Sequence, residues 1–220
     1  MTQVVVFGAA SIAEIVHYYL THDSAFEVAA FTVDHEHLAT DSFLGLPVVP
    51  FDELPRRYPP GQYAMFVAIG YSRMNRVREE RYRLAKAAGY EMITYVSTKA
   101  TVWPDSLIGD NCFIMENVIV HPFARVGNDV ILWSGSHIGH GTSIGDHCFI
   151  SSRTAISGNV TVEPNCFFGT NSTVRDYLTI GRESVVGAGA VVLKSTQPRG
   201  VYVAANARLM STPSDRLPNL

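Results

Sequence analysis

The chain has 220 residues, with 17 Lys plus Arg and 20 Asp plus Glu, which gives a formal net charge of −3. This length fits one large domain or two small ones, and the lack of a basic excess argues against nucleic acid as a partner. Charged residues make up 17 % of the chain, below the roughly 25 % of an average soluble protein. We therefore expect another subunit to cover part of the surface.

The N-terminus and the cysteines predict a cytoplasmic protein. No segment approaches the roughly 20 apolar residues that a membrane span needs. No basic stretch precedes the first apolar run, as a secretory signal would require. The three cysteines, Cys112, Cys148 and Cys166, are too few for a disulfide framework, and reduced thiols are the simplest interpretation.

Residues 1–97 have the alternating pattern of an α/β domain. Short β-branched runs predict strands at residues 4–7, 28–33, 63–69 and 92–96, with a further short strand within 45–50. Helices are predicted at about 12–20, capped by Ser11, and at 75–88, stopped by Gly89. This alternation favours a parallel sheet, whose ligand site lies at the carboxyl ends of its strands.

From Val102 the sequence has a period of six. Residues 102–197 divide into sixteen consecutive hexads without an insertion. The first position is Val, Ile, Leu or Phe in all sixteen, and the fifth is Ser, Cys, Val, Ala, Thr or Leu. A fixed period of this kind predicts a solenoid, in which stacked coils bury a core that one coil could not.

The hexads resemble those of the hexapeptide-repeat proteins, which fold as left-handed parallel β-helices. The resemblance implies triangular coils of three hexads, about five coils in all, with the first and fifth positions pointing inward. All three cysteines occupy fifth positions at multiples of 18 residues. They are therefore expected to stack in one interior column with Val130 and Ser184, as small core residues.

The third position of each hexad is expected to face outward, in three columns along the axis. One column, with two aspartates and an arginine, is expected to be a solvated face: Asp110, Asn128, Asp146, Pro164 and Arg182. The second column has only small side chains from its second member onward: Glu116, Ser134, Ser152, Thr170 and Ala188. The third carries a histidine followed by a glycine one coil along: Pro104, Pro122, His140, Gly158, Asp176 and Lys194.

The small outward residues of the second and third columns leave a shallow surface, which suits a thin ligand such as the pantetheine arm of coenzyme A. Glycine lets a ligand approach the backbone closely, so Gly158 is a candidate contact. Imidazole titrates near neutral pH and is suited to accept a proton from an attacking nucleophile, which makes His140 the candidate base. The alternative is that His140 is an exposed surface histidine. The candidate coenzyme contacts are Ser152, Gly158, Thr170, Ala188 and Lys194.

Most of the chain, from Val4 to about Val203, resembles the sugar O/N-acyltransferases of the sialic-acid O-acetyltransferase and bacillosamine N-acetyltransferase type. Three segments carry this resemblance. They are VVVFGAASIAEIVHYYL at the start, IGHGTSIGDHCFISSRTAISGNVTVEPNCFFGTNSTV in the coils and IGRESVVGAGAVVLKSTQPRGVYVAANARL at the end. The family's catalytic histidine occupies the third position of a hexad, which here is His140.

The resemblance implies a Rossmann-like, nucleotide-sugar-binding domain over residues 1–97. A left-handed β-helix acyltransferase domain over 98–200 and a C-terminal tail over 201–220 would follow it. Acetyl-CoA would lie in a groove between two subunits of a homotrimer. His140 would accept a proton from the sugar amine as that amine attacks the thioester, while backbone N–H groups stabilise the oxyanion. No metal is expected.

The sequence departs from the family's pattern at three places. The acidic residue that often follows the catalytic histidine is replaced by Gly141, so another group would have to orient His140. A second family histidine, near the acyl group, falls on Phe149. The usual Gly-x-Pro near the C-terminus is replaced by Ala-Asn-Ala at residues 205–207, which changes the expected contacts between the tail and CoA.

The candidate nucleotide site lies where three predicted strands end. A glycine turn opens the first helix, whose N-terminal amides favour phosphate. An acid ends the second strand, as in dinucleotide folds. The loop after the strand at 63–69 offers an arginine for phosphate and a tyrosine for stacking. The candidates are Gly8, Ala10, Ser11, Asp34, Gly70, Tyr71, Arg73 and Asn75. The turn is not GxGxxG, and the resemblance implies that this domain holds the nucleotide of a UDP-, dTDP- or GDP-linked sugar, which is therefore favoured over NAD.

The other histidines and arginines have simpler interpretations. His121 and His137 are minor candidates for a substrate or orienting role, and His147 is predicted to be solvated. The helix arginines Arg76, Arg78 and Arg81 are likewise predicted to be solvated.

The preferred function is acetyl-CoA-dependent N-acetylation of a nucleotide-linked 4-amino-4,6-dideoxy sugar, for surface polysaccharide or glycoprotein synthesis. Three alternatives remain. The first is O-acetylation of a sugar hydroxyl on the same fold. The second is a metal enzyme of the carbonic anhydrase type, with three histidines converging on zinc between subunits. The third is a non-catalytic trimer that only binds a nucleotide sugar.

Overall fold

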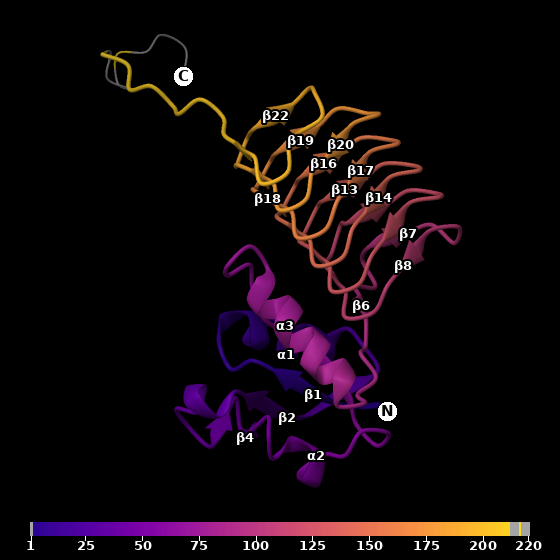
Figure 1. The fold of residues 1–220 in the computed structure, drawn as a ribbon, viewed down its shortest axis with the longest axis vertical. Helices are drawn as coiled ribbons and strands as arrows, with labels where there is room; N and C mark the ends of the chain where they lie inside the picture. The colour runs from indigo at the N-terminus through magenta and orange to yellow at the C-terminus, as the bar shows by residue number, and fades with distance from the viewer. Residues whose placement is uncertain (1, 212–215, 217–220) are drawn as a thin grey trace.

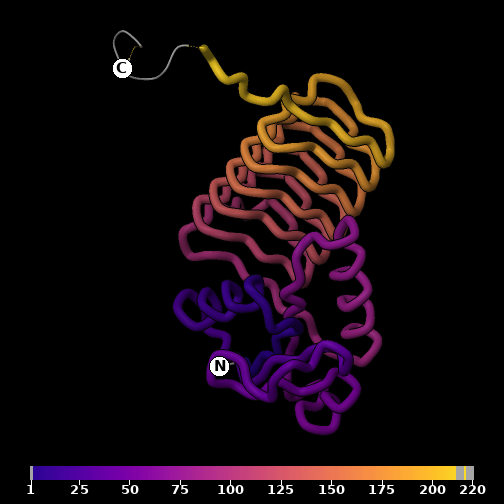
Figure 2. Tube along the Cα trace, turned by 90° about the vertical axis from the view of Figure 1, so that its left-hand side faces the viewer, coloured from indigo at the N-terminus to yellow at the C-terminus, as the bar shows by residue number. Residues whose placement is uncertain are grey.

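The fold is a computed structural model that describes residues 2–211 and 216 (Figure 1). A layered α/β unit at the N-terminal end leads into a stack of short parallel β-coils (Figures 1 and 2). Within the described part of the chain, the helices are too short or too polar to cross a membrane.

The α/β unit is built on a five-stranded sheet with the strand order β3-β4-β2-β1-β5. Its strands are parallel except for the β3–β4 hairpin. The strands are β1 (Thr2–Phe7), β2 (Phe26–Val33), β3 (Ser42–Phe43), β4 (Leu46–Pro50) and β5 (Ala64–Val67). The helices are α1 (Ser11–His22), η1 (His35–His37), α2 (Leu54–Arg57) and α3 (Arg76–Ala87). The predicted parallel sheet is therefore present, with one antiparallel edge that the sequence pattern did not indicate.

Two local predictions in this unit are wrong. The N-cap of α1 is Ala10, in extended conformation, and Ser11 is the first helical residue, without a side-chain cap. The predicted strand at 92–96 is not a strand of this sheet. Met92 only bridges to Met65, while β6 (Tyr95–Val96) pairs with β9 (Phe113–Ile114) in the coils. The amide of Tyr95 donates to the carbonyl of Cys112, so the first coil begins here.

The coils form a three-sided prism with one parallel sheet on each face. The seven-stranded face contains β6, β9, β12 (Ile131–Leu132), β15 (Phe149–Ile150), β18 (Phe167–Phe168), β21 (Val185–Val186) and β23 (Val201–Tyr202). The six-stranded face contains β7 (Thr101–Val102), β10 (Ile119–Val120), β13 (His137–Ile138), β16 (Ala155–Ile156), β19 (Thr173–Val174) and β22 (Val191–Val192). The five-stranded face contains β8 (Leu107–Ile108), β11 (Arg125–Val126), β14 (Ser143–Ile144), β17 (Thr161–Val162) and β20 (Thr179–Ile180).

The hexad register is confirmed by these strands. From β8 to β22 each strand consists of the sixth position of one hexad and the first of the next, and partners lie 18 residues apart, as in Ile119 beside His137. First and fifth positions point inward and are buried beyond the first coil. Interior hydroxyls bond to backbone carbonyls, as Thr142 does to Ser157 at 2.7 Å. The cysteines are buried in this interior, as predicted, and burial raises the pKa of Cys112 to about 12.

The corners of the prism depend on the fourth hexad position. Every fourth position from Asn111 to Gly189 has a positive φ, between +51° and +73°. This left-handed conformation is adopted most readily by Gly, Asn and Asp, which explains why these residues recur there. The tight corner lets the next face begin after only six residues.

Each corner is named here by its neighbour or its notable residue. The α1 corner joins the seven- and six-stranded faces and contains Glu116, Ser134, Ser152, Thr170 and Ala188. The His140 corner joins the six- and five-stranded faces and contains Pro104, Pro122, His140, Gly158, Asp176 and Lys194. The α3 corner joins the five- and seven-stranded faces and contains Asp110, Asn128, Asp146, Pro164 and Arg182. The residue that follows each of these in the chain also belongs to the α3 corner.

The α/β unit covers the seven-stranded face. Phe113, Ile131 and Phe149 of this face belong to one apolar core with Val4 and Phe66 of the five-stranded sheet. We therefore call the seven-stranded face the docked face. The His140 corner is the edge of the prism opposite to it, so it points away from the α/β unit of the same chain.

The α3 corner is an interface and not the predicted solvated face. α3 lies along this corner, with the pitch of about 5.4 Å of an α-helix close to the strand spacing of about 4.8 Å. Successive turns therefore meet successive coils. Lys86 bonds to Asp110, Arg78 to Asp129, and Asn75 to the carbonyls of Asn165 and Cys166.

The predicted solvation of Arg78, Arg81 and His147 is corrected by this packing, whereas the Arg76 side chain stays 43 % exposed. Arg78 is completely buried and donates to the Asp129 carboxylate and to the carbonyls of His147 and Cys148. His147 is also buried, with its Nδ1 2.8 Å from Asp129 Oδ2. Arg76 pairs with two glutamates, and Arg81 pairs with Asp34 at 2.7 Å.

Asp23, just after α1, ties the α/β unit to the first coil. Its carboxylate accepts hydrogen bonds from the hydroxyls of Tyr95, Ser97 and Thr98 and from the amide of Thr98. These bonds to Thr98 and Tyr95 favour the ionised form and hold the pKa of Asp23 well below its usual range.

We expect Asp23→Ala to lower the free energy of unfolding at neutral pH by about 1–2 kcal/mol, because charged hydrogen bonds are lost at a partly solvated site. A depressed carboxyl pKa gives stability that is present above the unfolded pKa and lost as the pH falls through the folded pKa. Urea unfolding at several pH values should therefore show the difference between wild type and variant shrinking at acidic pH. A difference that is constant with pH would contradict this role.

Candidate functional site

His140 lies on the open edge of the prism. It follows β13, in the turn before β14, and its side chain is exposed. Its carbonyl accepts the amide of Asn159 at 2.9 Å, and the next amide, of Gly141, donates to Pro122 at 3.2 Å. The backbone that carries the imidazole is thus fixed from the coil above and the coil below.

Gly158 provides the space for the His140 ring. A Cβ on residue 158 would lie 2.5 Å from Cε1 and 2.8 Å from Nε2 of His140. The ring therefore rests directly on the Gly158 backbone, one coil further along the axis. The sequence predicted Gly158 as a coenzyme contact, and the structure also gives it the role of supporting His140.

Gly158→Ala should displace the imidazole, because the added methyl group and the ring cannot occupy the same space. We expect kcat for acetyl transfer to fall by up to about 10²-fold, as for a reacting group moved by about 1 Å. Thermal melts of a double-mutant cycle with His140→Ala give a second readout. In that background the methyl group meets no ring, so the cost in stability of Gly158→Ala should be smaller. Equal costs in both backgrounds would contradict the contact.

The residue after His140 is a glycine for a structural reason. Gly141 is in the left-handed conformation, with φ +65°, and a Cβ there would lie 2.5 Å from Asn159 Oδ1. The side-chain amide of Asn159 thus occupies the space that a side chain at 141 would need. The ring of His140 is held by packing on Gly158, without an acidic neighbour in the chain.

The predicted coenzyme contacts fall on two different edges of the prism. Ser152, Thr170 and Ala188 lie on the α1 corner, and Gly158 and Lys194 lie on the His140 corner. The six-stranded face separates the two edges within one chain. A thin ligand that touches both sets would have to lie between the α1 corner of one copy and the His140 corner of another.

The predicted nucleotide residues gather at the carboxyl ends of β1 and β5. Gly8 follows β1 with φ +122°, and a Cβ there would lie 2.8 Å from the Ala68 carbonyl oxygen, so the turn requires glycine. Ala10 and Ser11 are exposed at the start of α1, where the first amides face outward. Gly70 and Arg73 belong to the adjacent loop after β5, and Arg73 is exposed.

Tyr71, in the same loop, joins an aromatic group on the docked face. Its ring centroid lies 5.0 Å from that of Phe149 and 4.9 Å from that of Phe167, and Tyr71 remains 56 % exposed. Trp133 lies beside Phe149 at 6.2 Å. Among the described residues, Trp133 Nε1 is the one buried side-chain nitrogen or oxygen without a hydrogen-bond partner. The predicted nucleotide loop therefore contacts an aromatic group on the docked face, beside which the Trp133 nitrogen is buried.

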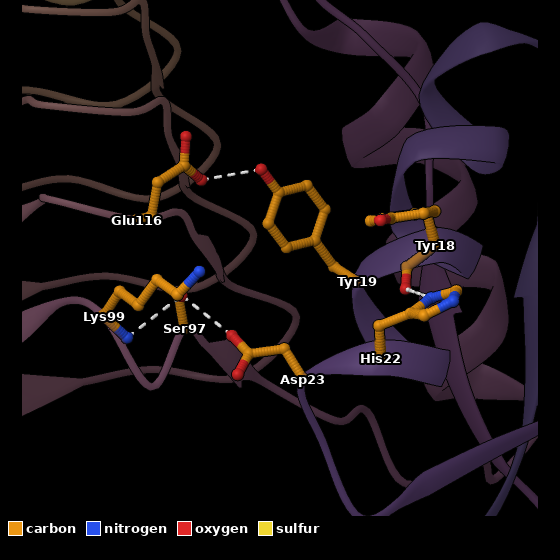
Figure 3. A pocket seen from close by; sticks show the side chains of 7 residues that line it. All are labelled: Tyr18, Tyr19, His22, Asp23, Ser97, Lys99 and Glu116. Atoms are coloured by element: carbon orange, nitrogen blue, oxygen red, sulfur yellow. Dashed lines mark hydrogen bonds between the residues drawn. The ribbon is translucent and has the colours of Figure 1, made fainter.

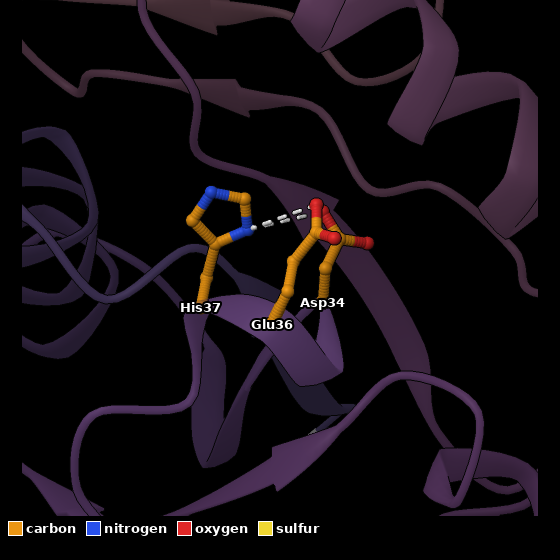
Figure 4. Close-up of side chains that lie close together, drawn as sticks. All are labelled: Asp34, Glu36 and His37. Carbon is orange, nitrogen blue, oxygen red and sulfur yellow. Dashed lines mark ion pairs between the residues drawn. The ribbon is translucent and has the colours of Figure 1, made fainter.

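Asp34 lies at the carboxyl end of β2, as predicted, but its carboxylate already has a partner. Arg81 of α3 donates to Asp34 Oδ2 from Nε at 2.8 Å. Figure 4 shows Asp34 with Glu36 and His37 of η1, whose ligand atoms lie within 4.8 Å of one another. Glu36 and His37 are exposed, and no further ligand completes this group among the described residues.

Asn75 is corrected to a structural residue. It is completely buried at the N-cap of α3, with φ +63°, and its amide nitrogen donates to the carbonyls of Asn165 and Cys166. Its amide oxygen accepts from Arg78 at 3.2 Å. No part of the side chain is left for a ligand.

Two further histidines lie on the six-stranded face beside the His140 corner. The ring centroids of His121 and His137 are 4.6 Å apart. Burial lowers the pKa of His137, and the neighbouring His121 lowers it further. His147, by contrast, lies on the α3 corner. His147 therefore lies on a different edge of the prism from the other three histidines.

A cavity of about 310 Å³ that the sequence did not indicate lies between α1 and the first coils (Figure 3). Tyr18, Tyr19 and His22 line it from α1, and Lys99 and Glu116 line it from the coils. Tyr19 donates to Glu116 at 2.6 Å, and burial together with this bond raises the pKa of Tyr19 to about 12. Tyr19 and Glu116, which meet across this cavity, are 97 residues apart in the chain, so no local sequence motif could reveal the cavity.

The comparison with known proteins agrees with this geometry. Residues 91–201 match the protein family described as the GMPPB C-terminal domain. PerB from Caulobacter crescentus, solved with CoA and GDP-perosamine, has a TM-score of 0.82 and 28 % identity, covering 93 % of this chain and 95 % of that one. A histidine-to-asparagine variant of the perosamine N-acetyltransferase of that organism, with the same ligands, has a TM-score of 0.83 and 26 % identity over 96 % and 98 %.

The acetyltransferase domain of PglB from Neisseria gonorrhoeae FA1090 shows the same fold, with a TM-score of 0.81 and 24 % identity over 93 % of this chain and 97 % of that one. The Caulobacter enzyme is a sugar N-acetyltransferase of the hexapeptide, left-handed β-helix type, and the stacked parallel coils of this chain fit that fold. The resemblance stated from the sequence is thereby confirmed.

Proposed function

The chain belongs to the family of the GMPPB C-terminal domain, and on this premise we propose that it transfers an acetyl group from acetyl-CoA to the amine of a nucleotide-linked 4-amino-4,6-dideoxy sugar. It is an acyltransferase of the sugar N-acetyltransferase type. The observation that carries the proposal is the likeness, over nearly the whole chain, to an enzyme solved with CoA and GDP-perosamine. The product would serve surface glycan synthesis.

The α/β unit is the proposed nucleotide-sugar domain, with a Rossmann-like arrangement. The glycine turn at Gly8 brings the exposed start of α1 beside the loop of Gly70 and Arg73, at the strand ends where such folds bind ligands. Amides at a helix start and an arginine suit a diphosphate. Of GDP, UDP and dTDP, GDP is favoured by the neighbour's ligand.

The position of His140 implies that two copies build each site. The α/β unit covers the docked face, and His140 is on the opposite edge of the prism. A sugar held by one chain's nucleotide loops therefore meets the His140 of another chain. This requirement, together with the two-edged distribution of the coenzyme contacts, supports a homotrimer with acetyl-CoA between subunits.

The chemistry needs one base and no covalent enzyme intermediate. The sugar nitrogen attacks the thioester carbonyl carbon, a C–N bond forms, and the C–S bond breaks to release CoA. His140 accepts the proton that the nitrogen loses, and the proton passes to the departing thiolate. Cys148 and Cys166 point into the coil interior and take no part in this step.

A turnover comparison distinguishes this function from two alternatives, sugar O-acetylation and binding without catalysis. Purified protein is given acetyl-CoA with a GDP-linked 4-amino sugar or with the matching 4-hydroxy sugar, and release of free thiol is followed. We expect turnover with the amine and little with the hydroxyl. Preference for the hydroxyl would make the protein an O-acetyltransferase, and binding without thiol release would make it a non-catalytic binding protein.

A further inference from the structure

Two large aromatic side chains project from the His140 corner. Phe123 is 67 % exposed and Tyr177 is 74 % exposed, and both occupy the fourth hexad position of this corner. Their φ angles are +63° and +57°, in the left-handed region. Arg153 and Glu183 adopt the same conformation at other corners, so the exposed apolar surface, and not the backbone, sets Phe123 and Tyr177 apart.

The corner itself does not require aromatic residues. The same fourth position is Asn at residues 111, 117, 159, 165 and 171, where the left-handed conformation costs least. Phe123 and Tyr177 therefore expose apolar surface at a position where several other corners have a polar residue.

The two aromatic residues flank His140 along the axis. Phe123 lies one coil before Gly141, and Tyr177 lies two coils after it. With a strand spacing of about 4.8 Å, they are about 14 Å apart, with the imidazole between them. They thus form a ridge that projects from the edge on which His140 is exposed.

A second copy of this chain is the occupant that fits the ridge. The chain's own α/β unit is on the opposite side of the prism, so it cannot cover these side chains. The adjoining six-stranded face continues the apolar surface with the exposed Trp103 and Ile119. Its outward positions from β7 to β22 include one charged residue, Arg175. Exposed aromatic residues beside a face with few charges are typical of the residues that anchor protein–protein interfaces.

We propose that Phe123 and Tyr177 are the anchors that seat the His140 corner on a second copy of this chain. The proposal names the residues that join the copies, and it rests on the proposed function only where it predicts a loss of turnover. A ligand such as CoA would explain Tyr177 but not Phe123, which lies on the other side of His140.

The test replaces both residues by asparagine, as Phe123→Asn and Tyr177→Asn in one chain. Asparagine suits the left-handed corner, so the folded coil should be kept or stabilised. We expect sedimentation velocity to show a smaller species than wild type at the same concentration. Activity per chain should fall about tenfold or more in dilute solution and recover in part at high concentration.

A matched control is available in the β3–β4 hairpin. Leu44 is also exposed, has φ +51° and precedes Gly45, so Leu44→Asn makes the same kind of change far from the corner. It should leave assembly and activity unchanged. If the double variant sediments and turns over as wild type does, the proposal is overturned. If wild type assembles through these residues but transfers no acetyl group, the assembly proposal stands and the proposed function fails.

Discussion

Replacing His140 with asparagine is expected to lower kcat for acetyl transfer by about 10²- to 10⁴-fold, the usual contribution of a general base. Asparagine keeps a polar side chain on the Gly158 backbone but cannot take a proton from the attacking amine. Because the exposed imidazole makes no packing contact in the interior, the thermal midpoint should change little. The assay follows free thiol with acetyl-CoA and the amino sugar nucleotide.

His22→Asn is the control for this substitution. His22 is exposed at the end of α1, where its Nδ1 donates to the Tyr18 carbonyl and its ring stacks on that of Tyr18, and it is far from the His140 corner. It should retain wild-type turnover. A His140→Asn enzyme with undiminished kcat would remove His140 from the chemical step, whatever the substrate proved to be.

The second large effect is expected at Arg78, in the interface between α3 and the coils. Arg78→Met should lower the free energy of unfolding by about 3–5 kcal/mol, because it leaves the completely buried Asp129 carboxylate without its guanidinium. The carbonyls of His147 and Gly70 also lose a donor. Urea unfolding of the two proteins measures the difference.

Arg83→Met is the matched change on the same helix. The Arg83 side chain is 69 % exposed and pairs with Glu79, so its loss should cost less than about 1 kcal/mol. Arg78→Lys keeps the charge but loses the forked set of guanidinium donors. Its free energy of unfolding should lie between those of Arg78→Met and Arg83→Met. If Arg78→Met and Arg83→Met were equally stable, the buried network would not hold the two parts together.

The hexad pattern predicted the coils well because each coil repeats the same constraint. An inward first position and a small inward fifth position are needed wherever coils stack, so the register of Cys148 or Ile138 follows from spacing alone. The same spacing placed His140 on an edge beside Gly158. These inferences needed only the period and the alternation of inward and outward positions.

The pattern could not predict what covers the outward positions. It assigned Asp146 and its column to solvent, because a hexad says only that a side chain faces out. Arg78 and Arg83 are both arginines of the same predicted helix, with nothing in the sequence to tell them apart. Only the packing of α3 against the coils buries Arg78 and leaves Arg83 exposed. The polar residues of α3 recur every three or four positions, one per turn, and this spacing was the signal available for the interface.

The most direct test of the account is the product of one reaction. Purified protein, acetyl-CoA and a GDP-linked 4-amino-4,6-dideoxy sugar are incubated, and the sugar nucleotide is examined by mass spectrometry and NMR. We predict a mass gain of one acetyl group, attached through the 4-amino nitrogen as an amide. A sugar nucleotide recovered without an acetyl group, or with it on oxygen as an ester, would contradict the account.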